Sequence, residues 1–307
     1  MPIISTSTGA FFERARQDIK GLRAQAETIQ SQLGSGERMA RSSDDPVAAS
    51  RLRTLARADS LSRIDTANAD RAESDLSLAD GALSDISRAL GRAKELATQA
   101  ANDTLSDSQR ASIGAELDSI EETLFSLANA RDSNGKALFG GEGTGAAYVR
   151  DAAGNAVYVG TASSSELPLG EGLSVARSLT GPEFLNFNDA AGNPTDLMAV
   201  VKTLSDALKG AAADPAGAAR AALDTLANGL DAVTTGQTVV GTRLAWIDVV
   251  GERRIDLSEM RAAEEADVGS IEIGDAVTRL QQAMVVLEAS QASFSKLSGL
   301  SLFNQLR

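Results

Sequence analysis

The residues of this 307-residue chain that first suggest catalysis are three pairs of adjacent carboxylates. They are Asp44 with Asp45, Glu121 with Glu122, and Glu264 with Glu265. Two carboxylates act as general acid and general base only when both face the same substrate. Successive residues of a helix point in different directions, so we interpret these pairs as solvated helix faces or as helix caps.

Other catalytic arrangements lack the residues they need. The sequence contains no His and no Cys, which excludes a Ser-His-Asp triad, a Cys/His zinc site and any disulfide. Ser293 and Lys296 have the Ser-x-x-Lys spacing of some nucleophilic enzymes, but they lie inside a regular apolar pattern. We treat that spacing as coincidence and expect no catalytic, cofactor-binding or metal site. The remaining alternative is a ligand site within residues 139–193, which a glycan- or ligand-binding test would detect.

Composition narrows the range of partners. The formal net charge is −13, so the chain repels both nucleic-acid backbones and anionic lipid surfaces, and we expect neither as a partner. No apolar run is long enough to span a membrane, and the first twenty residues lack the pattern of a cleavable secretory signal. Only 4% of the residues are aromatic, which favours closely packed helices over a thick globular core.

Two segments near the ends of the chain carry apolar residues at alternating spacings of three and four. This heptad period predicts a helix with one narrow apolar seam, as in coiled coils. The first seam consists of Phe12, Ala15, Ile19, Leu22, Ala26, Ile29 and Leu33, and the second of Ile273, Val277, Leu280, Met284, Leu287, Gln291 and Phe294. We expect the two helices to pair. Gln291 is either a tolerated edge residue or a polar contact that sets the register.

A polar connector follows the first of these helices. Gly34 and Gly36 weaken the helix, whereas Pro46 fits the first position of a new one, with Asp44 or Asp45 as its cap. Further apolar stripes predict helices over residues 72–100, 113–127, 197–208 and 223–260, with Thr104 or Ser106 as a cap before the second and a start at Asn193–Pro194 for the third.

The middle of the chain lacks the helical periodicity of the segments on either side. Residues 148–149 and 157–159 are β-type runs around a Gly154–Asn155 turn, which predicts a hairpin. The sequence therefore predicts a mainly α fold, a long antiparallel helical bundle or coiled coil formed by both terminal regions, with a small β-rich insert. We place the domains at residues 1–44 (assembly helix and connector), 45–138 (rod), 139–193 (β-rich outer insert), 194–266 (rod) and 267–307 (C-terminal assembly helix).

The terminal helices are marginal on their own. Ordering the 22 residues from 12 to 33 costs roughly 20–40 kcal/mol of backbone entropy. Burying the seam side chains returns only on the order of 10–15 kcal/mol, and an isolated helix of this length is barely stable. We therefore hypothesise that both end helices become ordered only when neighbouring copies or partners cover them.

The chain resembles the flagellin superfamily of bacterial axial proteins. The similar pieces include "ISTSTGAFFERARQDI", "ERMARSSDDPVAASRL", "RAESDLSLADGALSDI", "LANARDSNGKALFGG" and the terminal "LSLFNQL". They cover most of the chain outside the β-type insert. "SSDDPVAAS" and "SNGKALFGG" favour the junction-type members of the family over filament flagellin, which remains the alternative.

This resemblance implies a structural, non-enzymatic and secreted protein of the bacterial flagellum. Junction-type members link the hook, through hook-associated protein 1, to the flagellin filament after type III export, and they form a homo-oligomeric helical or ring assembly. The implied partners are hook-associated protein 1, flagellin and a flagellar export chaperone. The expected assembly interface comprises Phe12, Ile19, Leu22, Ile29, Leu33, Val277, Leu280, Met284, Leu287, Phe294, Leu300 and Phe303.

Overall fold

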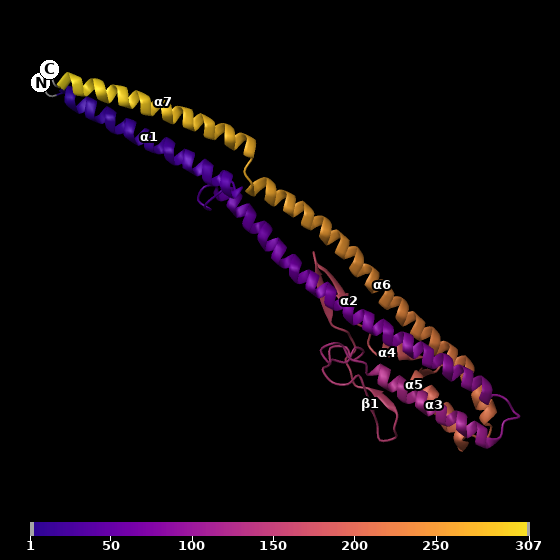
Figure 1. The fold of residues 1–307 in the computed structure, drawn as a ribbon. Coiled ribbons are helices and arrows are strands. Elements are labelled where there is room, and N and C mark those ends of the chain that lie inside the picture. The colour runs from indigo at the N-terminus through magenta and orange to yellow at the C-terminus, as the bar shows by residue number, and fades with distance from the viewer. Residues whose placement is uncertain (1–2, 306–307) are drawn as a thin grey trace. The chain divides into compact units, whose positions relative to one another are not determined.

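The computed structural model describes the backbone of residues 3–305 and the side chains of residues 9–297. Long helices account for most of it (Figure 1). They are α1 (Ile3–Ser35), α2 (Pro46–Ala100), α3 (Asp107–Ala128), α5 (Leu197–Asp206) with the short π-helix η1 (Ala207–Ala211), α6 (Pro215–Gly269) and α7 (Ile273–Gln305). The predicted mainly α fold is confirmed.

The chain divides into two compact units. The first comprises residues 1–60 and 256–307, and the second comprises residues 61–255. The limits of the units fall inside α2 and α6, so that each of these helices contributes to both. The five domain segments expected from the sequence stay a prediction.

In the first unit, α1 and α7 run antiparallel and lie side by side (Figure 1). The rings of Phe12 and Phe294 meet edge to face with their centroids 5.6 Å apart. At the opposite end of the pair, Glu37 and Ser270 form an antiparallel backbone bridge. The predicted pairing of the two terminal helices is therefore confirmed.

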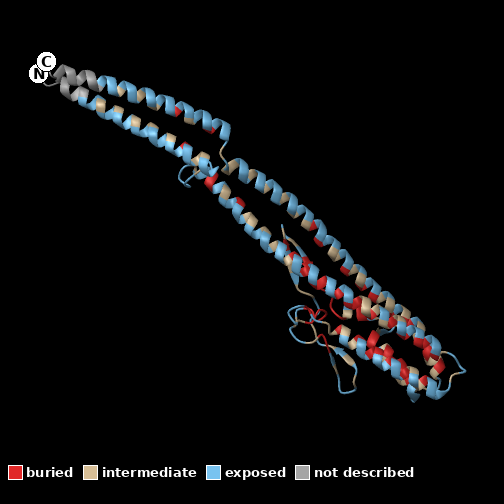
Figure 2. Cartoon of the chain, in the orientation of Figure 1, coloured by how far each residue is buried: buried red, intermediate tan, exposed pale blue. Residues whose placement is uncertain are grey.

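The second unit contains the hydrophobic core. Its buried residues lie where α2, α3, α5 and α6 come together, whereas α1 and α7 are mostly exposed (Figure 2). The seam predicted in α2 is buried along its length, and Ala72, Ala79, Ala93 and Ala97 are fully inaccessible to solvent. Alanine keeps the backbone of a helix close to its neighbours, which explains how a core with few aromatic residues packs tightly.

The middle of the chain forms three separate two-stranded hairpins. They are β1 (Tyr148–Arg150) with β2 (Ala156–Tyr158), β3 (Glu166–Gly170) with β4 (Leu173–Ala176), and β5 (Asn186–Asn188) with β6 (Pro194–Asp196), and the short helix α4 (Pro182–Leu185) precedes β5. The predicted hairpin around residues 154–155 is confirmed. The predicted helix start at Asn193–Pro194 is wrong, because Pro194 begins β6 and Asp196 caps α5 by accepting hydrogen bonds from the backbone N–H groups of Met198 and Ala199.

One turn occurs three times, a repeat that was not predicted from the sequence. In each case an Asp accepts hydrogen bonds of 2.8–2.9 Å from the backbone N–H groups two and four residues later. The fourth residue is a Gly with φ between +79° and +85°, a conformation that disfavours any residue with a Cβ. The three turns begin at Asp132, Asp151 and Asp189. The shared pattern, Asp-x-x-Gly, is the signal that would have revealed it.

Candidate assembly surface

The side of α1 that faces α7 follows the predicted seam. Ile29 is buried, and Phe12, Ile19, Leu22 and Leu33 are half-buried. Pairing with a single helix thus leaves most of this seam partly open to solvent. Burying the remaining apolar surface of these side chains against another surface would be favourable in free energy.

The side of α7 that faces α1 is rotated from the predicted seam. Leu280, Leu287 and Phe294 are half-buried as expected, but the most deeply buried positions are Ala276 and Ala283. Ala276, Leu280, Ala283 and Leu287 follow one another at spacings of four, three and four. They form a second stripe that shares Leu280, Leu287 and Phe294 with the predicted one.

Four residues of the predicted stripe are exposed instead. Ile273 is 66% exposed, Val277 39% and Met284 49%. Gln291 is exposed as well. The expected interface positions Leu300 and Phe303 lie outside the residues whose side chains are described.

Large apolar side chains also cover other parts of this helix pair. Phe11 on α1 is exposed, as are Val285, Val286 and Leu297 on α7. Among the side chains described for residues 9–297, α1 and α7 therefore present apolar surface on several sides. Extended exposed apolar surface on a protein usually marks a site where another protein binds.

The polar connector between α1 and α2 has a defined structure. The Asp45 carboxylate accepts hydrogen bonds from the backbone N–H groups of Ala48 (3.0 Å) and Val47 (3.2 Å), which makes Asp45 the cap of α2. The Ala48 N–H group and the Arg38 guanidinium, 2.8 Å away, lower the pKa of Asp45. Asp44 has a different role, because its carboxylate accepts a hydrogen bond from the Arg41 N–H group and closes the turn.

The same connector is bonded to the turn between α6 and α7. The Arg38 N–H group donates to the Gly269 carbonyl oxygen (2.8 Å), and the Ile271 N–H group donates to the Gly36 carbonyl oxygen (3.0 Å). The Gln32 side-chain amide in turn donates to the Arg38 carbonyl oxygen (2.6 Å). Both chain segments of the first unit therefore change from one helix to the next at one shared, hydrogen-bonded site, and Pro46 starts α2 directly beyond it.

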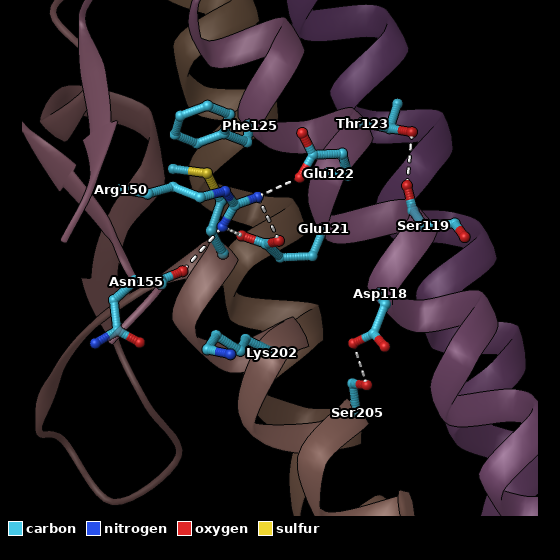
Figure 3. A network of polar contacts seen from close by, with 12 residues as sticks. Asp118, Ser119, Glu121, Glu122, Thr123, Phe125, Arg150, Asn155, Lys202 and Ser205 are labelled. Carbon is cyan, nitrogen blue, oxygen red and sulfur yellow. Dashed lines mark hydrogen bonds and ion pairs between the residues drawn. The ribbon is translucent and has the colours of Figure 1, made fainter. Parts of the chain in front are cut away.

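In the second unit, Arg150 connects the hairpin β1–β2 to α3 (Figure 3). The guanidinium forms ion pairs with Glu121 (2.9 Å) and Glu122 (2.5 Å) and lies over the ring of Phe125 at 4.4 Å from its centroid. Glu121 is buried, so the interpretation of this carboxylate pair as a purely solvated helix face is wrong for Glu121. The pair holds the hairpin and does not converge on a substrate site.

A second ion pair anchors the segment that follows β4. Arg177 contacts Asp75 on α2 (2.6 Å) and Asp132 in the loop after α3 (3.1 Å), and both carboxylates are only 3% exposed. Burial alone would raise the pKa of Asp132, but the N–H groups of Lys136 and Asn134 and the Arg177 charge outweigh it, so that this pKa is lowered. The cluster is a structural clamp within the second unit.

The remaining candidates for chemistry are dispersed. Ser293 and Lys296 are both exposed on α7. Glu264 forms an ion pair with Arg51, whereas Glu265 faces solvent. None of the helices described within residues 3–305 has the length and apolarity needed to cross a membrane. The main functional feature of the described residues is therefore the incompletely covered helix surface of the first unit.

These features define a class of protein, a mainly helical chain whose terminal helices pair, and comparisons show which known proteins it is similar to. Residues 6–144 match the family described as the bacterial flagellin N-terminal helical region. Over 306 residues the chain is 29% identical to flagellar hook-associated protein 3 of Escherichia coli, covering 94% of this chain and 96% of that protein. It is 27% identical to the Salmonella typhimurium protein of the same name, covering 97% and 98%.

A solved structure agrees in fold. The flagellar junction protein FlgL from Legionella pneumophila has a TM-score of 0.59 and 16% identity, covering 71% of this chain and 99% of that one. The chain is thus similar to flagellar hook-associated proteins 3 over nearly its full length, and residues 6–144 match the flagellin N-terminal region. The proteins that it is similar to are named as flagellar hook-associated and junction proteins.

Proposed function

We propose that this chain is a structural subunit of the junction between the flagellar hook and the flagellin filament. In this role it is exported by the type III pathway with the help of an export chaperone and then assembles with copies of itself. Hook-associated protein 1 contacts it on the hook side and flagellin on the filament side. Its location is outside the cell, at the hook–filament junction.

Homology along nearly the whole chain carries this proposal. The E. coli and S. typhimurium relatives are hook-associated proteins, and the match includes both terminal helices and the middle region. The exposed apolar side chains of α1 and α7 support it independently, because a subunit that works alone in water has little reason to expose Phe11, Val285 and Val286 together. The predicted interface residues are proposed to make contacts between subunits.

One specific observation favours filament flagellin as a second candidate. The matched family is named for flagellin, and the match covers residues 6–144, which include most of α1 and the connector. The two candidates differ in where the protein lies along the flagellum. A junction subunit occupies one short zone, whereas a filament subunit occupies the entire filament.

Immunogold labelling of isolated hook–filament structures tests the proposal. We expect gold only at the end of the hook, and we expect cells that lack the gene to release flagellin into the medium. Gold along the filament would instead support the flagellin alternative. Normal filaments on cells without the gene would overturn both candidates.

A second experiment addresses the C-terminal end. A chain truncated before residue 298 retains the second unit and most of α7, so it is expected to fold but not to hold filaments. Cells producing it should shed flagellin. Filament retention equal to that of the full chain would contradict a role for this end in the junction.

A further inference from the structure

The two outer faces of the first unit carry opposite charge where α2 and α6 run together. Within residues 46–60, α2 has three Arg residues and one Asp, whereas within residues 256–269 α6 has five carboxylates and one Arg. Two ion pairs connect the helices, Arg51 with Glu264 and Arg261 with Asp59. These pairs identify the inward side of each helix.

On α2, the remaining arginines point away from α6. Arg53 is two positions from Arg51, and Arg57 is two positions before Asp59, and two positions correspond to about 200° around a helix. Both arginines are exposed, and neither forms an ion pair with another residue in the range 9–297. Small residues surround them. We define this arginine face as Ser50, Arg53, Ala56, Arg57 and Ser60.

On α6, the corresponding face is acidic. Glu259 is two positions before Arg261, and Asp256 lies on the same side one turn earlier. Both carboxylates are exposed and have no ion-pair partner within the described side chains. Met260 lies beside them and is 65% exposed, which places a flexible apolar side chain next to the charges. We define this acidic face as Asp256, Glu259, Met260 and Ala263.

We propose that the arginine face of one copy docks on the acidic face of the next copy. The inference rests on the proposed function, because it needs the chain to assemble with itself. Charge complementarity supports it: Arg53 and Arg57 are four residues apart and Asp256 and Glu259 are three, so each pair spans about one helical turn. Small residues around the arginines leave room for the Met260 side chain.

The geometry also fits the expected type of assembly. The two faces lie on different helices of one unit and point outward, so each copy presents both halves of the contact. Such a heterologous contact does not satisfy itself in a closed dimer, and its repetition gives a ring or a helix. Two exposed ion pairs give little affinity alone, but they select the neighbour and the register in which apolar surfaces meet.

Disulfide cross-linking tests the contact directly, because the natural chain contains no Cys. Two differently tagged single variants, Arg57→Cys and Glu259→Cys, are produced together in cells that lack their own copy, and the isolated flagella are oxidised with diamide. We expect a disulfide between the two tags. Replacing the second variant with Glu265→Cys, an exposed position on another side of α6, is the matched control and should not cross-link.

Charge reversal provides a functional readout. Arg53→Glu with Arg57→Glu gives a chain with two acidic faces, and Asp256→Arg with Glu259→Arg gives one with two basic faces. Each variant alone should lower the number of attached filaments about tenfold, which corresponds to about 1.4 kcal/mol. Cells that produce both variants should recover filaments, because the two chains can alternate. Circular dichroism of each purified variant checks that it is folded.

The outcomes separate this inference from the proposed function. If the natural chain lies at the junction but neither cross-linking nor recovery by mixing occurs, the inference is overturned and the proposed function stands. Loss of filaments in each variant without recovery would point to a different protein as the occupant of these faces, which also overturns it. Absence of the natural chain from the junction would overturn both.

Discussion

Replacing Arg177 with Met is expected to destabilise the second unit severely. Arg177 is 18% exposed, and it forms ion pairs with two carboxylates that are each 3% exposed, Asp75 and Asp132. Met has a similar length but no charge, so the variant leaves both carboxylates buried without a cation. Breaking a buried ion pair by removing one partner costs about 3–5 kcal/mol, because the remaining charge is uncompensated.

The chain offers a selective assay. Its one tryptophan, Trp246, is 41% exposed and belongs to the second unit, so its fluorescence during urea unfolding reports on the unit that contains the clamp. We expect the free energy of unfolding at pH 7 to fall by about 3–5 kcal/mol. The matched control is Arg88→Met, because Arg88 forms an ion pair with Asp85 on the exposed surface of α2 and should be replaceable with little effect.

The stability deficit of the Arg177→Met variant should also depend on pH in a defined direction. In the natural chain the pKa of Asp132 is below its usual value of 3.8, so its contribution to stability is present above about pH 4 and is lost as the pH falls further. Without Arg177 this contribution shrinks, so the deficit of the variant should be largest near pH 7 and smaller near pH 3. A deficit below about 1 kcal/mol at pH 7 would refute the clamp, as would a deficit that stays constant to pH 3.

Three further substitutions test other parts of the molecule. Leu22→Asp puts a charge into the α1 seam, so filament retention should be lost while unfolding of the second unit, followed by Trp246 fluorescence, stays normal. Gln25→Asp, on the exposed side of α1, is the control. Filament retention by the Leu22→Asp variant would argue against the seam. Ser106→Ala removes the capping box that Ser106 forms at α3 and should cost about 0.5–2 kcal/mol in urea unfolding. Burial raises the pKa of Asp196 to about 6, so the folded chain gains stability as the pH falls from about 6 to about 4. Asp196→Asn keeps a capping group, so this variant should lack that gain and should be more stable than the natural chain at pH 7. An unchanged dependence of stability on pH would show that Asp196 is not responsible.

The sequence predicted the helices well because their periodicity is strong. The seam from Ala72 to Ala100 is buried as predicted, and Ser106, one of the two predicted candidates, caps α3. Asp45 caps α2, and Asp44, the other candidate, closes the connector turn. Local signals such as these depend only on neighbouring residues, so they can be read from one segment.

Long-range contacts could not be predicted in the same way. Arg177 contacts Asp75 across 102 residues of sequence, and Arg150 contacts Glu121 across 29. A single Arg in a loop shows no periodicity, and its partner is determined by how the hairpins fold back on the helices. The recurring Asp-x-x-Gly turns were visible in the sequence, but recognising them requires attention to the Asp as well as to the Gly.

The difference between the predicted and observed seams of α7 has a physical reason that bears on function. Leu280, Leu287 and Phe294 belong to two overlapping stripes, one completed by larger side chains such as Val277 and Met284 and the other by Ala276 and Ala283. Within one chain, α1 packs on the alanine side, where the helix backbones can approach each other closely. The larger side chains, which would gain most from burial, stay exposed. This division is what we expect of a helix that uses one side to pair within its own chain and keeps the adjacent side for another subunit.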